Sequence, residues 1–483
     1  MKCKTGMLRT SDSIINMKVR TRYAPSPTGK LHIGGARTAL FCFLFAKNQG
    51  GEFLLRLEDT DIAREVEGGE DNQIDGLNWL GIDIDYSPRN EDETGPFRQS
   101  ERLHIYTKYI NELLEKGVAY KCHCTQEELD KDYEEQKARG IVATKYNRKC
   151  LTNPEPKEGV VPTIRIKMPE GFDFKWNDLV RGEISFPSDA IGDWVAIKSN
   201  GIPSYNFANV VDDHLMNITH VMRGEEHTSN TPKQLHLYEE FGWTAPEFAH
   251  LTIITNSEGK KLSKRDESVL QFVHLYKERG YLPEAIFNFL SLLGWSPRSE
   301  EEIFTKEELI SKFDVEGLSK APSQFNVDKL KWTNNFYIKQ LDEEKLSKFL
   351  SPFIEDVEID EANKMEIMKL FQPQLREGVE IKELIKLFHE EYSISSENED
   401  FVKENIAVVR LMTQKLSDLE EWSAEKIKEA MNKVGEELEV KGKNLMMPIR
   451  LSVSGQNRGP DIAKTIEIFG KEKTMERFTK WNI

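Results

Sequence analysis

Two short segments of this chain constrain its fold more than any other feature, although they lie more than 200 residues apart. Pro25–Gly35 follows the alternating apolar run Val19–Tyr23, and this order indicates a strand, a Gly/Pro turn and a helix from about Ala36. Lys260–Arg265 is a cation cluster that follows an apolar run, Leu251–Ile254, predicted to be a strand. A glycine turn at a helix N-terminus admits a phosphate, and a cationic loop neutralises charge that develops on it. Together the segments predict an enzyme that holds ATP and transfers its nucleotidyl group.

Both segments resemble the signatures of class I aminoacyl-tRNA synthetases. His32-Ile33-Gly34-Gly35 stands where that family has His-x-Gly-His, and Lys261-Leu262-Ser263-Lys264-Arg265 stands where it has Lys-Met-Ser-Lys-Ser. Other stretches resemble the bacterial glutamyl-tRNA synthetases: Arg22–Gly29, Arg56–Asp61, and Tyr205–Ala208 through Asp212-Asp213-His214. The resemblance runs from about Met17 to the C-terminus. One departure is Gly35, which stands at the position of the second histidine.

Composition favours a soluble globular protein of several domains. The chain has 483 residues, more than one hydrophobic core usually organises, and we expect about two to four domains. Its apolar runs, such as Leu40–Ala46, are too short to span a bilayer. Five cysteines indicate a reducing, cytoplasmic protein without a disulfide framework. The net charge of −16 argues against a generic nucleic-acid coat, but a folded RNA could still bind to a local basic surface.

The first sixteen residues precede the family resemblance and contain Lys2, Lys4 and Arg9 with little acid. A transit peptide is one interpretation, but the stretch is short and lacks a convincing amphipathic pattern. We favour an unstructured extension, or a translation start at Met17.

Alternating patterns between Val19 and Tyr86 predict the opening of a parallel βαβ sheet. The pattern after about Ser268 is almost wholly helical. We therefore expect an α/β fold: a Rossmann-type doubly wound parallel sheet with an inserted α+β connective subdomain, followed by an all-α C-terminal half. Expected helices lie at 36–48, 70–80 and 100–115, with sheet-type sequence at 52–57, 163–167, 194–221 and 248–255.

The resemblance also implies what each part does. The expected parts are 1–16 (extension), 17–95 (first half of the catalytic domain), 96–192 (inserted acceptor-binding subdomain), 193–255 (second half of the catalytic domain), 256–325 (stem-contact helices with the cationic loop) and 326–483 (all-α anticodon-binding domain).

The reaction that the resemblance implies has two steps. The α-carboxylate of glutamate attacks the α-phosphate of ATP, and a ribose hydroxyl of tRNA(Glu) then attacks the glutamyl-adenylate. Alignment and charge stabilisation suffice, with His32, Lys261 and Lys264 as candidate catalytic residues and Mg²⁺ accompanying ATP. A solvated basic turn is the alternative interpretation of the lysines. The candidate ATP-binding residues are Ser26, Thr28, Gly29, His32, Gly34, Leu262, Ser263 and Lys264.

A glutamate substrate has two carboxylates and one ammonium, so its site needs two cations and one anion. Arg22 and Arg223 match the side-chain carboxylate, since a guanidinium can bind it bidentately. Tyr205 can add a hydroxyl, and Glu58 can take the ammonium. These roles depend on the match to family positions, as do the candidate lining residues Ala24, Ser26 and Asn209.

A cysteine cluster in the expected insertion suggests structural zinc. The candidate ligands are Cys122, Cys124, Tyr146 and Cys150. Some relatives instead end this pattern with Cys-x-His, but Thr152 stands at that spacing here. Free buried cysteines are the alternative.

The C-terminal half resembles the anticodon-reading domain of the bacterial enzymes. Within Gln372-Pro373-Gln374, glutamine stands where relatives restricted to the glutamate tRNA tend to have arginine. An amide both donates and accepts, so glutamine is less selective towards the last anticodon base. We therefore hypothesise that tRNA(Gln) is charged as well. A monomer is expected. Two other functions are considered: a glutamyl transferase that modifies a tRNA base, which would lack this long helical half, and a catalytically inactive tRNA-binding relative.

Overall fold

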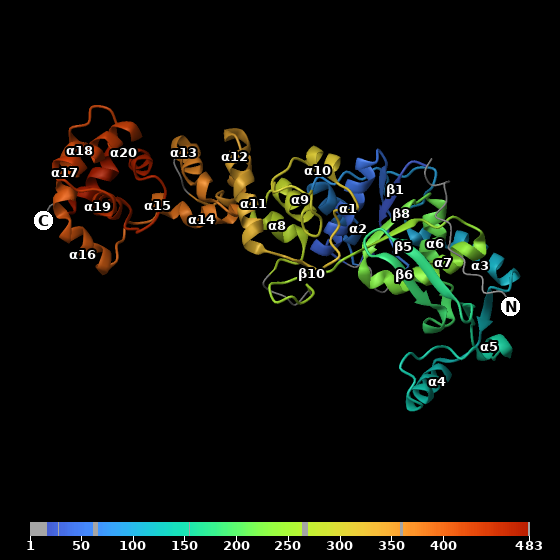
Figure 1. Ribbon diagram of the computed structural model, residues 1–483. Coiled ribbons are helices and arrows are strands. Elements are labelled where there is room, and N and C mark those ends of the chain that lie inside the picture. Colours follow the sequence, from blue (N-terminus) through green and yellow to red (C-terminus); the bar gives the residue numbers. More distant parts are fainter. Residues whose placement is uncertain are drawn as a thin grey trace. The chain divides into compact units, whose positions relative to one another are not determined.

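The structure is a computed structural model, and it describes residues 17–27, 29–60, 66–153, 155–262, 269–357 and 361–481 (Figure 1). The chain divides into two compact units. The first contains the residues up to Lys277 together with Pro283–Val327, and the second contains Glu278–Leu282 and Asp328–Ile483. The main division, after Val327, lies two residues beyond the boundary at 325/326 that we expected.

A six-stranded sheet organises the first unit, in the order β2-β1-β8-β9-β5-β6. Neighbouring strands pair in parallel except for the antiparallel pair β5/β6, so the Rossmann-type prediction is confirmed. The strands are β1 (Arg20–Tyr23), β2 (Glu52–Leu55), β5 (Asp173–Asp178), β6 (Gly182–Pro187), β8 (His220–Gly224) and β9 (Glu247–Leu251).

The strand order reverses between β1 and β8. From β1 the chain continues through α1 (Ile33–Asn48) to β2 on one side, and from β8 through α7 (Thr231–Phe241) to β9 on the other. In sheets of this kind, ligands bind outside the carboxyl ends of the strands where the order reverses. We therefore expect the ligand site at the residues that follow β1 and β8.

Helix α1 begins at Ile33, three residues before the expected start, because His32 caps it. The Gly34 N–H donates to Nδ1 of His32 at 3.0 Å. The helix is buried along most of its length, from Ala39 to Ala46, because it packs against the sheet and also against α9 (Pro283–Ser291) and α10 (Lys306–Lys312).

The strands of the expected insertion belong to two different sheets. A separate antiparallel sheet contains β3 (Ala119–Cys122), β4 (Thr163–Ile166) and β7 (Trp194–Ile197). Strands β5 and β6 lie within 96–192, yet they extend the large sheet, whereas β7 lies beyond 192 and completes the small one. The strand pairing thus crosses the expected boundary at 192/193, because alternation along a strand marks its faces and does not identify its partner.

Two predicted strands differ from the observed elements. The segment 194–221 contains β7 and β8, but between them lies α6 (Tyr205–Leu215), whose Phe207, Val210 and Val211 have helical spacing and are buried. The run Leu251–Ile254 is not one strand, since β9 ends at Leu251 and β10 (Ile254–Thr255) pairs with β11 (Ser323–Gln324). The remaining helices of this unit are α2 (Gly69–Trp79), α3 (Leu103–Glu115), α4 (Gln126–Ala138) and α5 (Lys149–Thr152), and α8 (Val273–Arg279) spans the first division point.

The described elements of the second unit are all helices, as predicted. Their apolar faces meet in one core, which includes Val409 and Met412 of α17 and Ile449 of α19. The helices are α11 (Val327–Lys339), α12 (Glu343–Leu350), α13 (Glu361–Phe371), α14 (Ile381–Leu384), α15 (Lys386–His389), α16 (Ser396–Glu404), α17 (Ile406–Ser417), α18 (Ala424–Glu437), α19 (Lys443–Ser454) and α20 (Ile462–Thr479). Within the described part of the chain, no helix has both the length and the apolar character needed to cross a membrane.

Candidate active site

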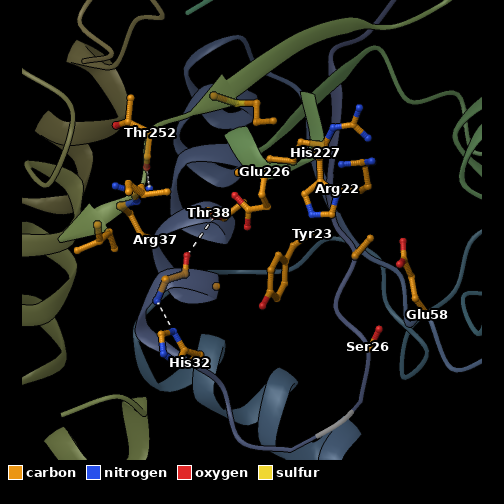
Figure 2. A pocket seen from close by; sticks show the side chains of 18 of the residues that line it. Arg22, Tyr23, Ser26, His32, Arg37, Thr38, Glu58, Glu226, His227 and Thr252 are labelled. Atoms are coloured by element: carbon orange, nitrogen blue, oxygen red, sulfur yellow. Dashed lines mark hydrogen bonds between the residues drawn. The ribbon is translucent and has the colours of Figure 1, made fainter. Parts of the chain in front are cut away.

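A cavity of about 460 Å³ opens where the strand order reverses (Figure 2). The end of β1 contributes Arg22, the end of β8 contributes Arg223, and the start of α1 contributes Gly34. Figure 2 shows Arg22 and Glu58 on one side of the cavity and His32 on the other, with the ring of Tyr23 between them.

The cavity brings together most of the residues that the sequence singled out. The predicted residues that line it are Arg22, Ala24, Ser26, His32, Gly34, Glu58, Tyr205, Asn209, Arg223, Lys261 and Leu262. Gly29 is described but does not line the cavity. Thr28, Ser263 and Lys264 lie outside the described residues. The two signature segments therefore meet at one cavity through His32 and Lys261.

The His32 ring is fixed on both sides. Its Nδ1 accepts the Gly34 N–H, so its proton is on Nε2, which lies 3.0 Å from Oε1 of Gln271. The ring also packs edge-on against Phe272. The Nε2–H group, from which a phosphate oxygen would accept a hydrogen bond, is thus already oriented. Gln271 stabilises this tautomer of the ring.

Arg22 lies in a buried cluster with its countercharge. Its Nε and Nη2 donate to the two carboxylate oxygens of Asp213, at 3.0 and 3.2 Å. Arg56 donates to the same carboxylate at 2.7 Å. Burial disfavours the charged carboxylate, but the attraction of Arg22 and Arg56 outweighs it and lowers the pKa of Asp213. The positive charge of Arg22 is therefore balanced within the protein.

Glu58 lies beside this cluster without forming a close ion pair. Its Oε1 accepts from Nδ2 of Asn209 at 2.7 Å and lies 3.9 Å from the Arg56 guanidinium. Burial raises the pKa of Glu58 to about 7, although Arg56 opposes this shift. The carboxyl thus gains or loses its proton near neutral pH, and a nearby ligand cation would favour the charged form.

Arg223 is buried among neutral partners. Its Nε donates to Nε2 of His250 at 3.2 Å, its Nη2 to the Thr231 hydroxyl at 2.8 Å, and its Nη1 to the Tyr205 hydroxyl at 3.4 Å. Among the described residues, no carboxylate lies within ion-pair distance of Arg223. Burial accordingly lowers its pKa. A buried cation of this kind favours an anionic ligand.

The cationic segment follows β10, which pairs with β11, and reaches the cavity from there. Lys261 bridges Thr255 at the end of β10, and Leu262 beside it is buried. Both line the cavity, so the first two residues of the Lys-Leu-Ser-Lys-Arg segment lie at the site.

Sequence reasoning missed part of the cavity wall. The additional lining residues are Tyr23, Gly35, Arg37, Thr38, Met222, Gly224, Glu226, His227, Thr252, Ile253 and Ile254. Gly35 has a direct explanation, since a Cβ there would lie 2.3 Å from the Tyr23 hydroxyl. Arg37 could have been found from its position one turn after Gly34. Its guanidinium donates to the carbonyl of Thr252 and thus connects α1 to the segment that leads to β10.

The cysteine cluster has the dimensions of a tetrahedral metal site. The sulfurs of Cys122 and Cys124 lie 3.4 and 3.5 Å from the Tyr146 hydroxyl, and Cys124 and Cys150 sulfurs are 3.5 Å apart. Bonds of about 2.3 Å to sulfur and about 2.0 Å to oxygen would place tetrahedral S and O ligands about 3.5 Å apart. The three sulfurs lie within 4.8 Å of one another, close enough for these side chains to share one zinc ion.

This combination of a Rossmann-type sheet, a capped His-x-Gly turn and a downstream cationic segment defines a class I aminoacyl-tRNA synthetase. The family model "tRNA synthetases class I (E and Q), catalytic domain" matches residues 18–332, and the model "Anticodon binding domain" matches 342–481. Together they cover most of the chain.

Curated and solved proteins narrow the family further. The chain is 52% identical to a glutamate–tRNA ligase of Geobacillus thermodenitrificans, over 96% of this chain and 98% of that one. It is 50% identical to one of Bacillus subtilis, over 95% and 99%. A crystal structure of a glutamate tRNA ligase from Elizabethkingia meningosepticum, in complex with its amino acid, has a TM-score of 0.87 at 37% identity, over 96% and 99%. The chain therefore belongs to the glutamate–tRNA ligase family.

Proposed function

We propose that the chain attaches glutamate to tRNA(Glu) in an ATP-dependent reaction, through a glutamyl-adenylate. The main support is the cavity, where buried Arg223 and partly buried Glu58 lie together with His32 and Lys261. A carboxylate and an ammonium complement the first pair, and a triphosphate complements the second. The near full-length identity to glutamate–tRNA ligases supports the same activity.

The first step joins glutamate to the α-phosphate of ATP. The α-carboxylate attacks that phosphorus and pyrophosphate leaves, while Arg223 and Glu58 hold the amino acid in place. His32 and Lys261 stabilise the negative charge on the phosphoryl oxygens. Mg²⁺, which class I enzymes use with ATP, would be held by the nucleotide's own oxygens. In the second step a ribose hydroxyl of the terminal adenosine attacks the acyl carbon and AMP leaves.

The direct test is ATP–pyrophosphate exchange and tRNA charging with glutamate, glutamine or aspartate, in the presence of tRNA(Glu). Of these three amino acids, we expect only glutamate to support activity. Lys264→Ala, at a position outside the described residues, should lower adenylate formation by orders of magnitude while glutamate binding is retained. Absence of glutamate-dependent exchange, or unchanged turnover of Lys264→Ala, would contradict the proposal.

Two features favour this function over its alternatives. A base-modifying glutamyl transferase would lack the helical half, whereas the anticodon-binding model matches residues 342–481 here. An inactive relative is expected to lose the nucleotide signatures, whereas His32 and Lys261 both line the cavity.

We propose further that tRNA(Gln) is also a substrate, with Gln374 as the discriminating residue. The Gln372 amide donates to the carbonyls of Ile338 and Leu341, at 2.8 and 2.9 Å, so it is engaged at the C-terminal end of α11. Gln374 is exposed, which leaves its amide accessible to an anticodon base. Charging of both tRNAs by the unaltered protein, and of tRNA(Glu) alone by Gln374→Arg, is expected. Strict rejection of tRNA(Gln) by the unaltered protein would end this hypothesis.

Zinc bound by Cys122, Cys124, Tyr146 and Cys150 is a separate proposal, and its role would be structural. The support is the ligand geometry given above. Metal analysis of the purified protein should find about one equivalent of zinc, lost in Cys124→Ser, together with a lower thermal stability of that variant. Well under one equivalent in the unaltered protein would contradict zinc binding.

We also propose that the protein acts as a monomer in the cytoplasm. Size-exclusion chromatography with light scattering should give a mass close to that of one 55.8 kDa chain. A dimer at micromolar concentration would contradict the monomer.

A further inference from the structure

A buried chain of hydrogen bonds leads to Arg223 from residues that do not line the cavity. Oδ2 of Asp178 lies 2.5 Å from Nδ1 of His250, and Nε2 of His250 lies 3.2 Å from Nε of Arg223. Thr231 closes the arrangement, because its hydroxyl lies 3.1 Å from the same His250 nitrogen and accepts from Nη2 of Arg223. Asp178 and His250 are both fully buried.

These contacts fix the tautomer of His250. The Arg223 Nε–H can only donate, so Nε2 of His250 must be the unprotonated acceptor and Nδ1 must have the proton. The Asp178 carboxylate accepts that proton's hydrogen bond. Burial lowers the pKa of His250, which favours the neutral ring that this arrangement needs. The imidazole therefore presents a lone pair to Arg223.

The orientation of the Arg223 guanidinium follows. His250 and Thr231 occupy the edge formed by Nε and Nη2, so a carboxylate cannot bind bidentately there. Tyr205 accepts from Nη1, and of the five N–H groups the two that remain are one on Nη1 and one on Nη2. We propose that Asp178 and His250 are positioning residues that hold Arg223 with this end toward the substrate carboxylate. This inference rests on the proposed glutamate-binding role of Arg223.

The aspartate comes from the β5/β6 strand pair, which lies within the expected insertion, 96–192. Asp178 ends β5 and pairs with Phe248 of β9. Its Oδ1 also accepts the backbone N–H groups of Val180, Arg181 and His250, at 3.0, 2.9 and 3.2 Å. Asp178 thus joins the β5–β6 hairpin to the large sheet as well as orienting His250. Replacing it would disturb the fold, so His250 is the better position to test.

Asparagine and glutamine at position 250 separate the two contacts. The shorter amide of His250→Asn can donate to Asp178 from about the Nδ1 position but offers no acceptor to Arg223. The longer amide of His250→Gln can place an oxygen near the Nε2 position and accept from Arg223. We expect His250→Asn to raise the glutamate KM roughly tenfold, and His250→Gln to change it less than about threefold. The ATP KM should change in neither variant, because the proposed function assigns the triphosphate to His32 and Lys261 and not to Arg223.

A double-mutant comparison identifies the route of the effect. With Arg223→Gln already present, His250→Asn should raise the glutamate KM no further, since the residue it orients is gone. Thr231→Val and Thr231→Ser form a second pair if His250→Asn does not fold: valine removes the oxygen, serine keeps it, and only valine should raise the glutamate KM. Circular dichroism and thermal unfolding establish that the compared variants are folded.

The outcomes are distinguishable. Equal glutamate KM values for His250→Asn and His250→Gln, or a similar rise in the ATP KM, would overturn the positioning role. If Arg223→Gln alone left the glutamate KM unchanged, the glutamate-binding role of Arg223 would fall, and this inference with it. A rise for Arg223→Gln without any for His250→Asn would leave the proposed function intact and refute only the inference.

Discussion

Arg22 and Arg223 line the same cavity and are buried to the same degree, yet their surroundings differ. Arg22 forms a two-point contact with Asp213, whose charge Arg56 shares. Arg223 donates to an imidazole and two hydroxyls, and the described residues give it no carboxylate partner. The pKa values respond accordingly: burial lowers that of Arg223, whereas the attraction of Asp213 overcomes burial and raises that of Arg22.

From this difference we infer that Arg22 is mainly a structural cation and that Arg223 is the ligand-binding one. Two arginines matched the substrate carboxylate equally well in the sequence. In the structure, Arg22 already has a countercharge in Asp213, whereas Arg223 would gain from the substrate a countercharge that it lacks. We therefore expect the side-chain carboxylate of glutamate to depend mainly on Arg223.

The largest effect is expected for Arg223→Gln. Losing the charge at this buried position should raise the glutamate KM about 100-fold or more, because the bound carboxylate would lose its countercharge. Charging assays over a wide glutamate range measure this change, with the ATP KM as the internal control. A rise in the glutamate KM of less than a few-fold would contradict the ligand-binding role of Arg223.

A pH dependence tests Glu58, the acidic residue of the cavity that we assign to the substrate ammonium. The pKa of Glu58 is raised to about 7, so this carboxyl takes up a proton as the pH falls through 7 and loses its attraction for the ammonium. The lowered pKa of Asp213 keeps the Arg22 cluster ionised over the same range. Between pH 7 and pH 6 we expect the glutamate KM to rise by up to about tenfold.

Glu58→Gln provides the matched control for this pH dependence. Its glutamate KM should be higher at pH 8 and should no longer change between pH 8 and pH 6. A flat profile in the unaltered protein would show that Glu58 does not titrate in the free enzyme.

Arg22→Gln should have a smaller effect on binding and a larger effect on stability. Without Arg22, Asp213 keeps only the bond to Arg56, so a buried carboxylate loses one of its two cations. We expect the thermal unfolding midpoint to fall by several degrees and the glutamate KM to rise less than for Arg223→Gln. The reverse order of KM effects would show that the two arginines have exchanged roles.

The smallest change is expected for Tyr205→Phe. The Tyr205 hydroxyl accepts from Arg223 at 3.4 Å, a long contact whose loss leaves the bonds to His250 and Thr231 in place. We expect the glutamate KM to rise about threefold. A rise as large as that for Arg223→Gln would indicate that the hydroxyl itself binds the substrate.

The residues that the sequence predicted share a local backbone requirement. His32 caps α1 and Gly34 leaves room beside it, so a strand, a turn and a helix start within one stretch were enough to find them. Asp178 and His250 have no such signal, because they lie 72 residues apart in ordinary strands and meet only when β5 pairs with β9. The same long-range pairing explains why β5 and β6, which lie within the expected insertion, extend the large sheet, while the fold class is confirmed. Arg22 and Arg223 could not be distinguished either, since a countercharge such as Asp213 is identified only in three dimensions.

A structure of the protein with glutamate bound is the most direct test of the difference between the two arginines. We expect the side-chain carboxylate within about 3 Å of Nη1 and Nη2 of Arg223, with the Arg22–Asp213 and Arg223–His250 contacts retained. A carboxylate held by Arg22 alone, with Asp213 displaced and Arg223 still on its neutral partners, would contradict it.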